Sequence, residues 1–354
     1  MNRLKSIQKH SSLLYKNWNI TPRILKDYFK LIVLRKKVLR KVDFAMTTDC
    51  NAKCPHCFAS TLIDNSREQM SLEEIKRCIT EAVQLGAIAF EFLGGEPLLC
   101  HHLCDAIRFA KDSKAIVGIT TNGLLLNEKK VNNLKEAGLD VIQFSLDSME
   151  PGEHDTSRGV LGCYDKVMKA LELVKASGIN IMLSTIATNE NISSKEILRT
   201  IKFAQKLDVP ITLNPASKVG GWREVVNLYL TEENRAVYHK ILKTSSHTRW
   251  SGDMNFLGDG CSCGRETIFI TSYGDVIPCG FIQISYGNIR KESLHEIWDR
   301  LCKMPLKNQG DNTCKASLDT NFIEKYLNPL VNEKNLPIFI EDHPHYANRK
   351  KTQI

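Results

Sequence analysis

The chain has 354 residues, which is enough for two domains and too long for a small disulfide-stapled scaffold. Hydrophobic residues make up 42% and charged residues 25%, an ordinary globular composition that excludes a wholly disordered chain. The net charge of +8 comes from residues 1–41, which hold 12 lysines and arginines and one acidic residue, Asp27. The remainder is close to neutral, so we expect no general affinity for nucleic acid.

The N-terminus shows neither a secretory signal pattern nor a membrane-spanning run, because its longest clean apolar stretch is Leu31–Leu34. We therefore expect a cytoplasmic protein. The chain has 12 cysteines, and in a reducing compartment those that cluster are expected to bind metal or to do redox chemistry rather than to form disulfides. Cys78, Cys100, Cys104 and Cys163 lie in or beside predicted helices and are expected to be core or surface thiols.

Residues 1–41 form a basic segment whose apolar residues recur at near-helical spacing. These residues are Ile24, Leu25, Tyr28, Ile32 and Leu39, with Trp18 just before them and basic residues between them. A basic amphipathic helix of this kind can make a peripheral contact with an anionic membrane. The more common alternative is that its apolar face packs on the protein body while the basic side chains stay in water.

Six short β-branched or aromatic runs follow, at residues 42–47, 89–93, 115–120, 141–146, 179–186 and 209–213. Amphipathic stretches with helix signals separate them, and the first begins with a capping box at Ser71 and ends at Gly86. Alternating strands and helices predict an α/β fold with a parallel sheet. The sheet could be open and doubly wound, but six units without a seventh and an eighth favour a partial (β/α)6 TIM-like barrel over residues 42–225.

The pattern changes in residues 226–354, which we expect to form a small α+β domain. Residues 231–243 predict one helix and residues 293–301 a second, shorter one. Between them, residues 267–271 and 276–279 flank a Tyr-Gly-Asp turn and predict a β-hairpin.

Three cysteines, Cys50, Cys54 and Cys57, follow the first predicted strand with the spacing C-x3-C-x2-C. The carboxyl ends of the strands are where β/α folds place their chemistry. Zinc would normally take four ligands, whereas three thiolates in one short loop favour an iron–sulfur cluster with one open iron. The alternatives are a structural zinc knuckle, with His56 as a neighbour, or three unrelated thiols.

The segment from Cys50 to Phe58, Cys-Asn-Ala-Lys-Cys-Pro-His-Cys-Phe, resembles the signature of the radical S-adenosylmethionine (radical SAM) superfamily, and the resemblance covers roughly residues 42–216. It implies a 4Fe–4S cluster whose open iron chelates the amino and carboxylate groups of SAM. An electron, from a donor such as flavodoxin or ferredoxin, would then cleave SAM to methionine and a 5′-deoxyadenosyl radical that abstracts a substrate hydrogen.

The same resemblance implies that polar residues at the other strand ends bind SAM. Glu96 in Gly94-Gly95-Glu96-Pro97 would hold the methionine amine, and Arg158 the carboxylate. The remaining expected contacts are Phe58, Asn122, Ser145, Asp147, Thr185 and Asn214. Tight turns and a solvated surface arginine are the structural alternatives.

The cysteines after residue 260 resemble the opening of a SPASM or twitch domain, which holds auxiliary iron–sulfur clusters. A full SPASM domain would continue with further C-x2-C groups, but here Ser317 stands where a second cysteine would follow Cys314. We therefore expect one auxiliary 4Fe–4S cluster. Its expected ligands are Cys261, Cys279 and Cys314, with Cys263 or Cys302 as the fourth, and free buried thiols are the alternative.

The sequence thus predicts a radical SAM enzyme with a partial barrel and a twitch-like C-terminal domain. It would modify an unactivated carbon of a small-molecule, lipid-linked or peptide substrate. The N-terminal segment is shorter than the leader-binding domain that peptide maturases often carry, which lowers but does not remove the peptide interpretation. A non-catalytic metal-binding scaffold is the alternative from another class.

Overall fold

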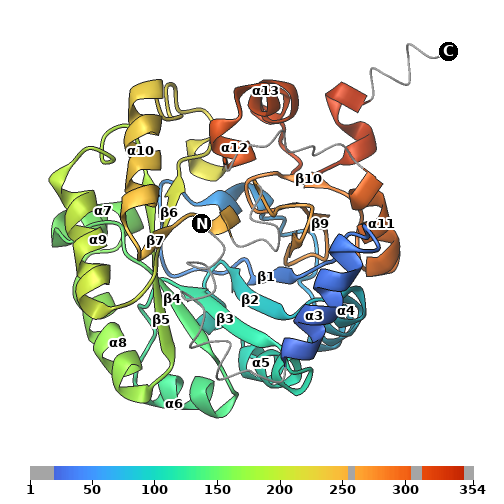
Figure 1. Ribbon diagram of the computed structural model, residues 1–354. Coiled ribbons are helices and arrows are strands. Elements are labelled where there is room, and N and C mark those ends of the chain that lie inside the picture. The colour runs from blue at the N-terminus through green and yellow to red at the C-terminus, as the bar shows by residue number, and fades with distance from the viewer. Residues whose placement is uncertain (1–19, 254–259, 304–312, 347–354) are drawn as a thin grey trace.

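The computed structural model describes residues 20–253, 260–303 and 313–346, and its centre is one curved sheet of nine strands (Figure 1). Their order is β7-β6-β5-β4-β3-β2-β1-β8-β9, and neighbours are parallel except β8 and β9. The strands are β1 (Lys41–Thr47), β2 (Ala89–Gly94), β3 (Ile116–Thr121), β4 (Val141–Ser145), β5 (Asn180–Ala187), β6 (Ile211–Pro215), β7 (Thr248–Arg249), β8 (Thr267–Ile270) and β9 (Val276–Ile277).

Helices surround the outer face of this sheet, and the predicted partial TIM-like barrel is confirmed (Figure 1). They are α4 (Leu72–Leu85), α5 (Leu103–Asp112), α6 (Glu128–Glu136), α8 (Cys163–Ser177), α9 (Lys195–Leu207) and α10 (Glu232–Thr244), and a further helix, α7 (Pro151–Arg158), follows β4. Local sequence sets several of the helix ends. Ser71 and Glu74 form the predicted capping box of α4, and Gly86 ends that helix with a left-handed φ of 115°.

The two faces of the strands differ in polarity. Side chains under the helices are buried and mostly apolar, as with Phe90 and Phe144. The inner face carries a polar chain, in which Thr120 Oγ1 donates to Glu91 Oε1 (2.8 Å) and Gln143 Nε2 donates to Thr120 Oγ1 (3.2 Å). Strand alternation therefore separates an apolar shell from a hydrogen-bonded barrel interior.

The sheet does not end with the six predicted strands. Beyond residue 225, β7 pairs with β6, and β8 pairs with β1 through Lys41 and Thr267. With two residues, β7 is too short to produce an alternating pattern that sequence reasoning could detect. The C-terminal part thus extends both edges of the barrel sheet, and a domain boundary at residue 225 stays a prediction.

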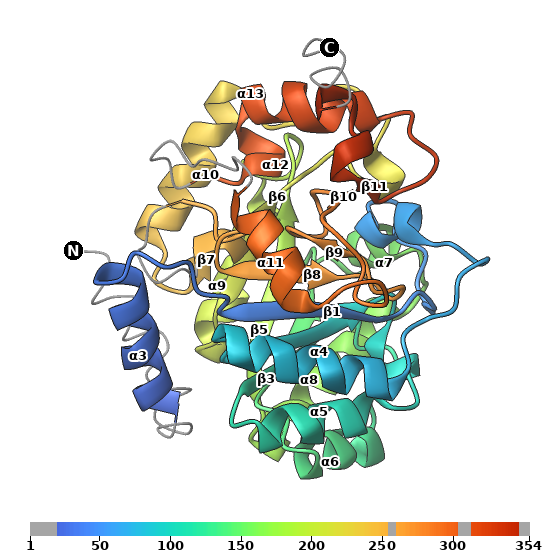
Figure 2. The same ribbon diagram turned by 90° about the vertical axis from the view of Figure 1, so that its right-hand side faces the viewer.

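The rest of the C-terminal part packs over one end of the barrel (Figure 2). The predicted hairpin is present as β8 and β9, and the predicted short helix as α11 (Leu294–Lys303). Two further strands, β10 (Ile284–Ser285) and β11 (Ile338–Phe339), pair in parallel. The remaining helical pieces are α12 (Lys315–Leu318), α13 (Thr320–Phe322), a π-helical turn (Ile323–Leu327) and the 3-10 turn Asn328–Leu330.

The N-terminal segment contains the helix α3 (Thr21–Ile32), which lies at the edge of the molecule (Figure 2). The apolar residues named for this segment pack on the body only in part, since Ile24 and Tyr28 are half-buried. Leu39 is buried, but Leu25 and Ile32 are exposed. Trp18 lies outside the described residues. None of the helices in the described part of the chain has the length and hydropathy needed to cross a bilayer.

Candidate active site

Cys50, Cys54 and Cys57 lie in the loop that follows β1, and Cys50 is three residues beyond the end of that strand. Cys50 is exposed and the other two thiols are half-buried. Burial raises the pKa of Cys50 and Cys54, and the charge of the neighbouring thiols adds to the effect. Because the pKa values are raised, binding of iron to these thiols would release protons.

Other parts of the chain fix the backbone of this loop. Lys53 N donates to the carbonyl oxygen of Arg158 at the end of α7 (3.1 Å). On the other side, a Cβ on Gly220 would lie 1.7 Å from the carbonyl oxygen of Cys57, and one on Gly221 would lie 2.0 Å from that of Pro55. The 3-10 turn Gly220–Trp222 therefore touches the cysteine loop at a distance that only glycine permits. We did not anticipate these glycines from the sequence, although a Gly-Gly pair just after a strand end was a usable signal.

His56 lies within the loop but does not act as an exposed base. Its ring packs on Trp222, with 5.2 Å between the ring centroids. Burial lowers the pKa of His56 to about 4, so the imidazole is neutral at physiological pH.

Glu96 is buried beside the loop and accepts three hydrogen bonds. The donors are the backbone nitrogens of Leu98 (3.1 Å) and Asn122 (2.9 Å) and the hydroxyl of Thr121 (2.7 Å). Burial raises the pKa of Glu96, and these three donors oppose that rise. The carboxylate is therefore held rigidly in position.

The Gly-Gly-Glu turn and Asn122 both reach the cysteine loop. A Cβ on Gly95 would lie 2.1 Å from the carbonyl oxygen of Asp49, so the turn can approach the loop only with glycine at that place. Asn122 Nδ2 donates to Asn51 Oδ1 (2.8 Å) and lies 3.9 Å from Cys50 Sγ. The structure thus brings Gly95, Glu96 and Asn122 together around Cys50. Gly94, which precedes this turn, is the last residue of β2.

Asp147 and Arg158 form a buried ion pair on the opposite side of the loop. Arg158 Nη2 lies 2.7 Å from Asp147 Oδ2, and Arg158 Nη1 lies 4.0 Å from Cys54 Sγ. Burial alone would raise the pKa of Asp147, but Arg158 and the Ser157 hydroxyl lower it below its usual value. The alternative of a solvated surface arginine is therefore wrong.

This ion pair also leaves two buried polar atoms without partners among the described residues, Asp147 Oδ1 and Arg158 Nε. One is an acceptor and the other a donor, and they belong to a pair whose Arg158 Nη1 lies 4.0 Å from Cys54 Sγ. Buried polar atoms are normally satisfied in proteins, so this pair has capacity for the polar groups of a bound molecule. A cofactor with amino, carboxylate and hydroxyl groups fits that requirement.

The remaining expected contacts lie at the carboxyl ends of successive strands. Ser145 is half-buried at the end of β4, and Thr185 Oγ1 in β5 donates to the carbonyl oxygen of Asp147 (3.4 Å). Asn214 Oδ1 in β6 accepts from Ser251 N (3.2 Å), so that side chain also fixes a loop after β7. The three side chains line the same edge of the sheet as the cysteine loop.

Phe58, which directly follows Cys57, faces the C-terminal part. Its ring makes edge contacts with Phe269 and Phe281, at centroid distances of 5.8 and 6.0 Å. Gln283 Nε2 donates to the Phe58 carbonyl oxygen (2.9 Å). The structure therefore uses this residue to join the cysteine loop to the C-terminal hairpin.

Four of the C-terminal cysteines form a second thiol group: Cys261, Cys263, Cys279 and Cys314. Cys263 contacts both Cys261 and Cys279, and Cys314 influences the pKa of Cys263. Cys302 lies on α11, where Lys37 Nζ donates to its carbonyl oxygen, and burial raises the pKa of its thiol to about 11.

Ser317 occupies the place where a further cysteine would stand. It accepts a hydrogen bond from Cys314 Sγ (3.4 Å) and donates to the carbonyl oxygen of Pro215 (3.1 Å). It thereby links the second thiol group to the end of β6. Within the described ranges, no three His, Cys, Asp or Glu side chains converge on a single metal ion. A cluster spreads its ligands over several iron atoms, so the two thiol groups suit clusters better than single ions.

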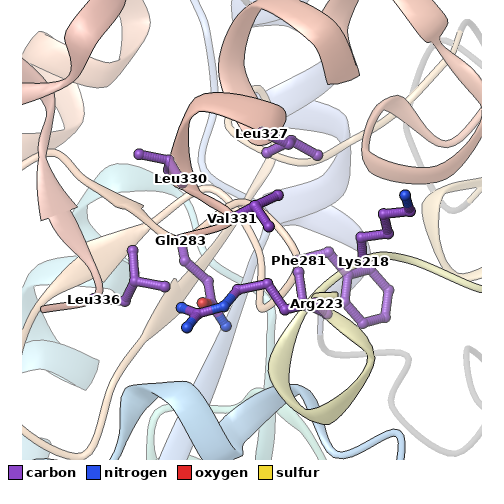
Figure 3. Close-up of a pocket in the computed structure, with 9 residues that line it drawn as sticks. Lys218, Arg223, Phe281, Gln283, Leu327, Leu330, Val331 and Leu336 are labelled. Atoms are coloured by element: carbon purple, nitrogen blue, oxygen red, sulfur yellow. The ribbon is translucent and has the colours of Figure 1, made fainter. Parts of the chain in front are cut away.

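A small hollow lies between the loop after β6 and the C-terminal part (Figure 3). Phe281, Leu327 and Leu336 give it apolar walls. Its polar side chains already have protein partners, since Arg223 Nη1 donates to a backbone carbonyl oxygen (2.6 Å). The hollow has only about 20 Å³ of free volume, which is room for about one water molecule and far below the roughly 300–1,000 Å³ of a small-molecule site.

Comparisons with known proteins agree with these observations. Residues 44–204 match the family model of the radical SAM superfamily, and residues 261–316 match that of SPASM, an iron–sulfur cluster-binding domain. An AdoMet-dependent heme synthase from Methanosarcina barkeri is 24% identical over 73% of this chain and 82% of its own length (AdoMet is SAM). A PqqA peptide cyclase from Rhizobium meliloti is 25% identical over 72% of each chain.

Among solved structures, Streptococcus suis SuiB bound to precursor peptide SuiA superimposes with a TM-score of 0.62, at 18% identity, over 77% of this chain and 67% of SuiB. That likeness concerns the fold. The matched domains bring a 4Fe–4S cluster and SAM to the barrel, and iron–sulfur binding to the C-terminal part. The chain therefore contains a radical SAM domain at residues 44–204 and a SPASM domain at residues 261–316, and the relatives that it resembles are radical SAM enzymes.

Proposed function

We propose that Cys50, Cys54 and Cys57 hold the SAM-binding cluster and that Cys261, Cys263, Cys279 and Cys314 hold one auxiliary cluster. The observation that carries the first assignment is the loop after β1, where three thiols stand beside buried polar atoms that lack partners. The grouping of four thiols, without Cys302, supports the second.

In this proposal the polar residues of the strand ends bind and orient SAM. Glu96 offers a rigid buried carboxylate for an ammonium group. Asp147 Oδ1 and Arg158 Nε offer an acceptor and a donor in the ion pair that approaches Cys54. When bound, the cluster and SAM supply the reductive cleavage of SAM and the abstraction of a substrate hydrogen atom. The protein's share is to position these groups and to exclude water.

We further propose that the substrate carbon lies at the mouth formed by the strand ends and the C-terminal part. A small-molecule or lipid-linked substrate is the first candidate. A peptide is the second, and the similarity to PqqA peptide cyclase and to SuiB, solved with a precursor peptide, favours it. The proposal also includes an electron donor such as flavodoxin or ferredoxin. It places the protein in the reducing cytoplasm, with which the 12 free thiols are consistent.

Formation of 5′-deoxyadenosine by anaerobically reconstituted, reduced protein tests the cluster assignment. The variant with Cys50, Cys54 and Cys57 all replaced by Ala should form none. The matched control, Cys100→Ala with Cys104→Ala, should keep the wild-type rate. Undiminished cleavage of SAM in the triple variant would show that these cysteines are not the ligands.

Deuterated candidates then identify the substrate class. Deuterium from a true substrate should appear in 5′-deoxyadenosine, and candidate peptides can be compared directly with small molecules. A non-catalytic scaffold would bind iron without cleaving SAM, and that result would refute the proposed activity.

A further inference from the structure

The helix α3 is attached to the protein by its polar edge rather than by its apolar one. Asp27 is 3% exposed, and Lys30 Nζ donates to it (3.4 Å). Arg23 donates to the backbone carbonyl oxygens of Ser113 (2.9 Å) and Ala87. Gly86 leaves room for this contact, since a Cβ there would lie 3.3 Å from Asp27 Oδ1.

This attachment turns the apolar side chains of α3 and the following turn toward solvent. They form what we call the apolar ridge: Leu25, Phe29, Ile32, Val33 and Leu34, each between 49% and 65% exposed. Five of the eleven exposed large hydrophobic side chains among the described residues fall within this ten-residue stretch. Single exposed hydrophobics are ordinary, but a contiguous group at one place marks an interaction site.

Cationic side chains border the ridge. Lys26, Arg35, Lys36 and Lys37 are exposed, and the first three make no ion pair within residues 20–253, 260–303 and 313–346. The acidic residue of the helix, Asp27, is buried and turned away. A second copy of the chain would bring cations against cations, whereas an anionic lipid surface complements both the apolar side chains and their basic border.

We propose that the apolar ridge inserts into the interface of an anionic bilayer and holds the enzyme at the membrane surface as a peripheral protein. Arg23 bonds α3 to the carbonyl oxygens of Ser113 and Ala87, so the helix is already formed in the folded protein and need not form on binding. This inference stands apart from the proposed function, because it involves neither thiol group.

Vesicle sedimentation of the full chain tests the proposal. The wild type should pellet with phosphatidylglycerol–phosphatidylcholine vesicles, less so at high salt, and only weakly with phosphatidylcholine alone. Leu25→Ser with Phe29→Ser should lower binding by tenfold or more, estimated roughly from the apolar area lost. Arg35→Gln with Lys36→Gln should lower it by about fivefold per charge, and mainly at low salt.

The matched control replaces two exposed leucines elsewhere, Leu161→Ser with Leu198→Ser, and should bind as the wild type does. Iron content per chain confirms that each variant is folded. Equal binding by the wild type and the ridge variant would overturn the proposal. Negligible binding by the wild type would also overturn it. In that case, a dimer seen by sedimentation velocity for the wild type but not for the ridge variant would show that the ridge mediates self-association.

Discussion

The buried ion pair between Arg158 and Asp147 should make a large and measurable contribution to stability. The informative substitution is Arg158→Met, which keeps most of the side-chain volume and removes the charge. In the wild type, the two side chains are 10% and 11% exposed and lie 2.7 Å apart. After the substitution, Asp147 retains the Ser157 hydroxyl as its partner but no counter-charge.

The expected loss follows from the cost of leaving one charge of a buried pair alone. Such losses are about 3–5 kcal/mol, whereas replacing both charges together is often nearly neutral. The free energy of unfolding of Arg158→Met should therefore fall by about that amount at neutral pH. The double variant Asp147→Asn with Arg158→Met should recover roughly 2 kcal/mol or more of it.

The pH dependence gives a second, independent check. Arg158 lowers the pKa of Asp147 in the folded wild type, so the pair stabilises above the unfolded pKa and loses that stabilisation as pH falls through the folded value. In Arg158→Met, burial dominates and raises the pKa of Asp147, so acidification lets the carboxyl take up a proton in the folded state. The difference between wild type and variant should therefore shrink as pH is lowered.

Urea unfolding of the iron-free proteins, followed by tryptophan fluorescence and circular dichroism, measures these differences. The transitions from the two probes should coincide before a free energy is derived. A loss below about 1 kcal/mol at neutral pH, or a difference that stays constant on acidification, would refute the reasoning. Either result would mean that water reaches the pair and screens it.

Four further substitutions test the two thiol groups and the residues around them. Glu96→Gln should weaken SAM binding, because the new amide nitrogen would face a hydrogen-bond donor, either the Thr121 hydroxyl or Asn122 N. Calorimetry measures the affinity while the cluster absorbance should persist, and unchanged affinity would contradict the prediction. Cys263→Ala should lower the iron content by about four atoms per chain, and Cys302→Ala should not change it. The opposite result would make Cys302, and not Cys263, the ligand of the auxiliary cluster. Gly220→Ala should reduce iron loading at the first cluster, since its Cβ would lie 1.7 Å from a backbone oxygen, and full loading would show that the turn can move.

Much of the barrel could be predicted because its signals are local. The capping box at Ser71 and the glycine stop at Gly86 depend on residues within a few positions of each other. The cysteine loop was recognisable for the same reason. Polar residues at strand ends could be assigned to one edge because parallel strands share a direction.

What could not be predicted depends on contacts between distant parts of the chain. The sequence around Arg158 was as compatible with a surface arginine as with a buried one. Arg158 is the last residue of α7, and this helix has no clear apolar stripe that would have indicated which of its side chains are buried. The orientation of α3 depends on two backbone carbonyl oxygens of Ser113 and Ala87, which no pattern in residues 20–41 reveals. Hydrophobic periodicity identified the helix but could not say which edge would face the protein.

The C-terminal part contacts the cysteine loop of the barrel directly. Its strand β8 pairs with β1, the strand that leads into the cysteine loop, and Arg40 Nε lies 3.0 Å from Glu266 Oε2 just before β1. Gln283 and Gly280 contact Phe58 directly after the third cysteine. The loop is thus held at both ends by residues that also surround the second thiol group. Phe58 therefore lies in direct contact with the segment that carries Cys279, and it is the residue through which the two thiol groups are joined by packing.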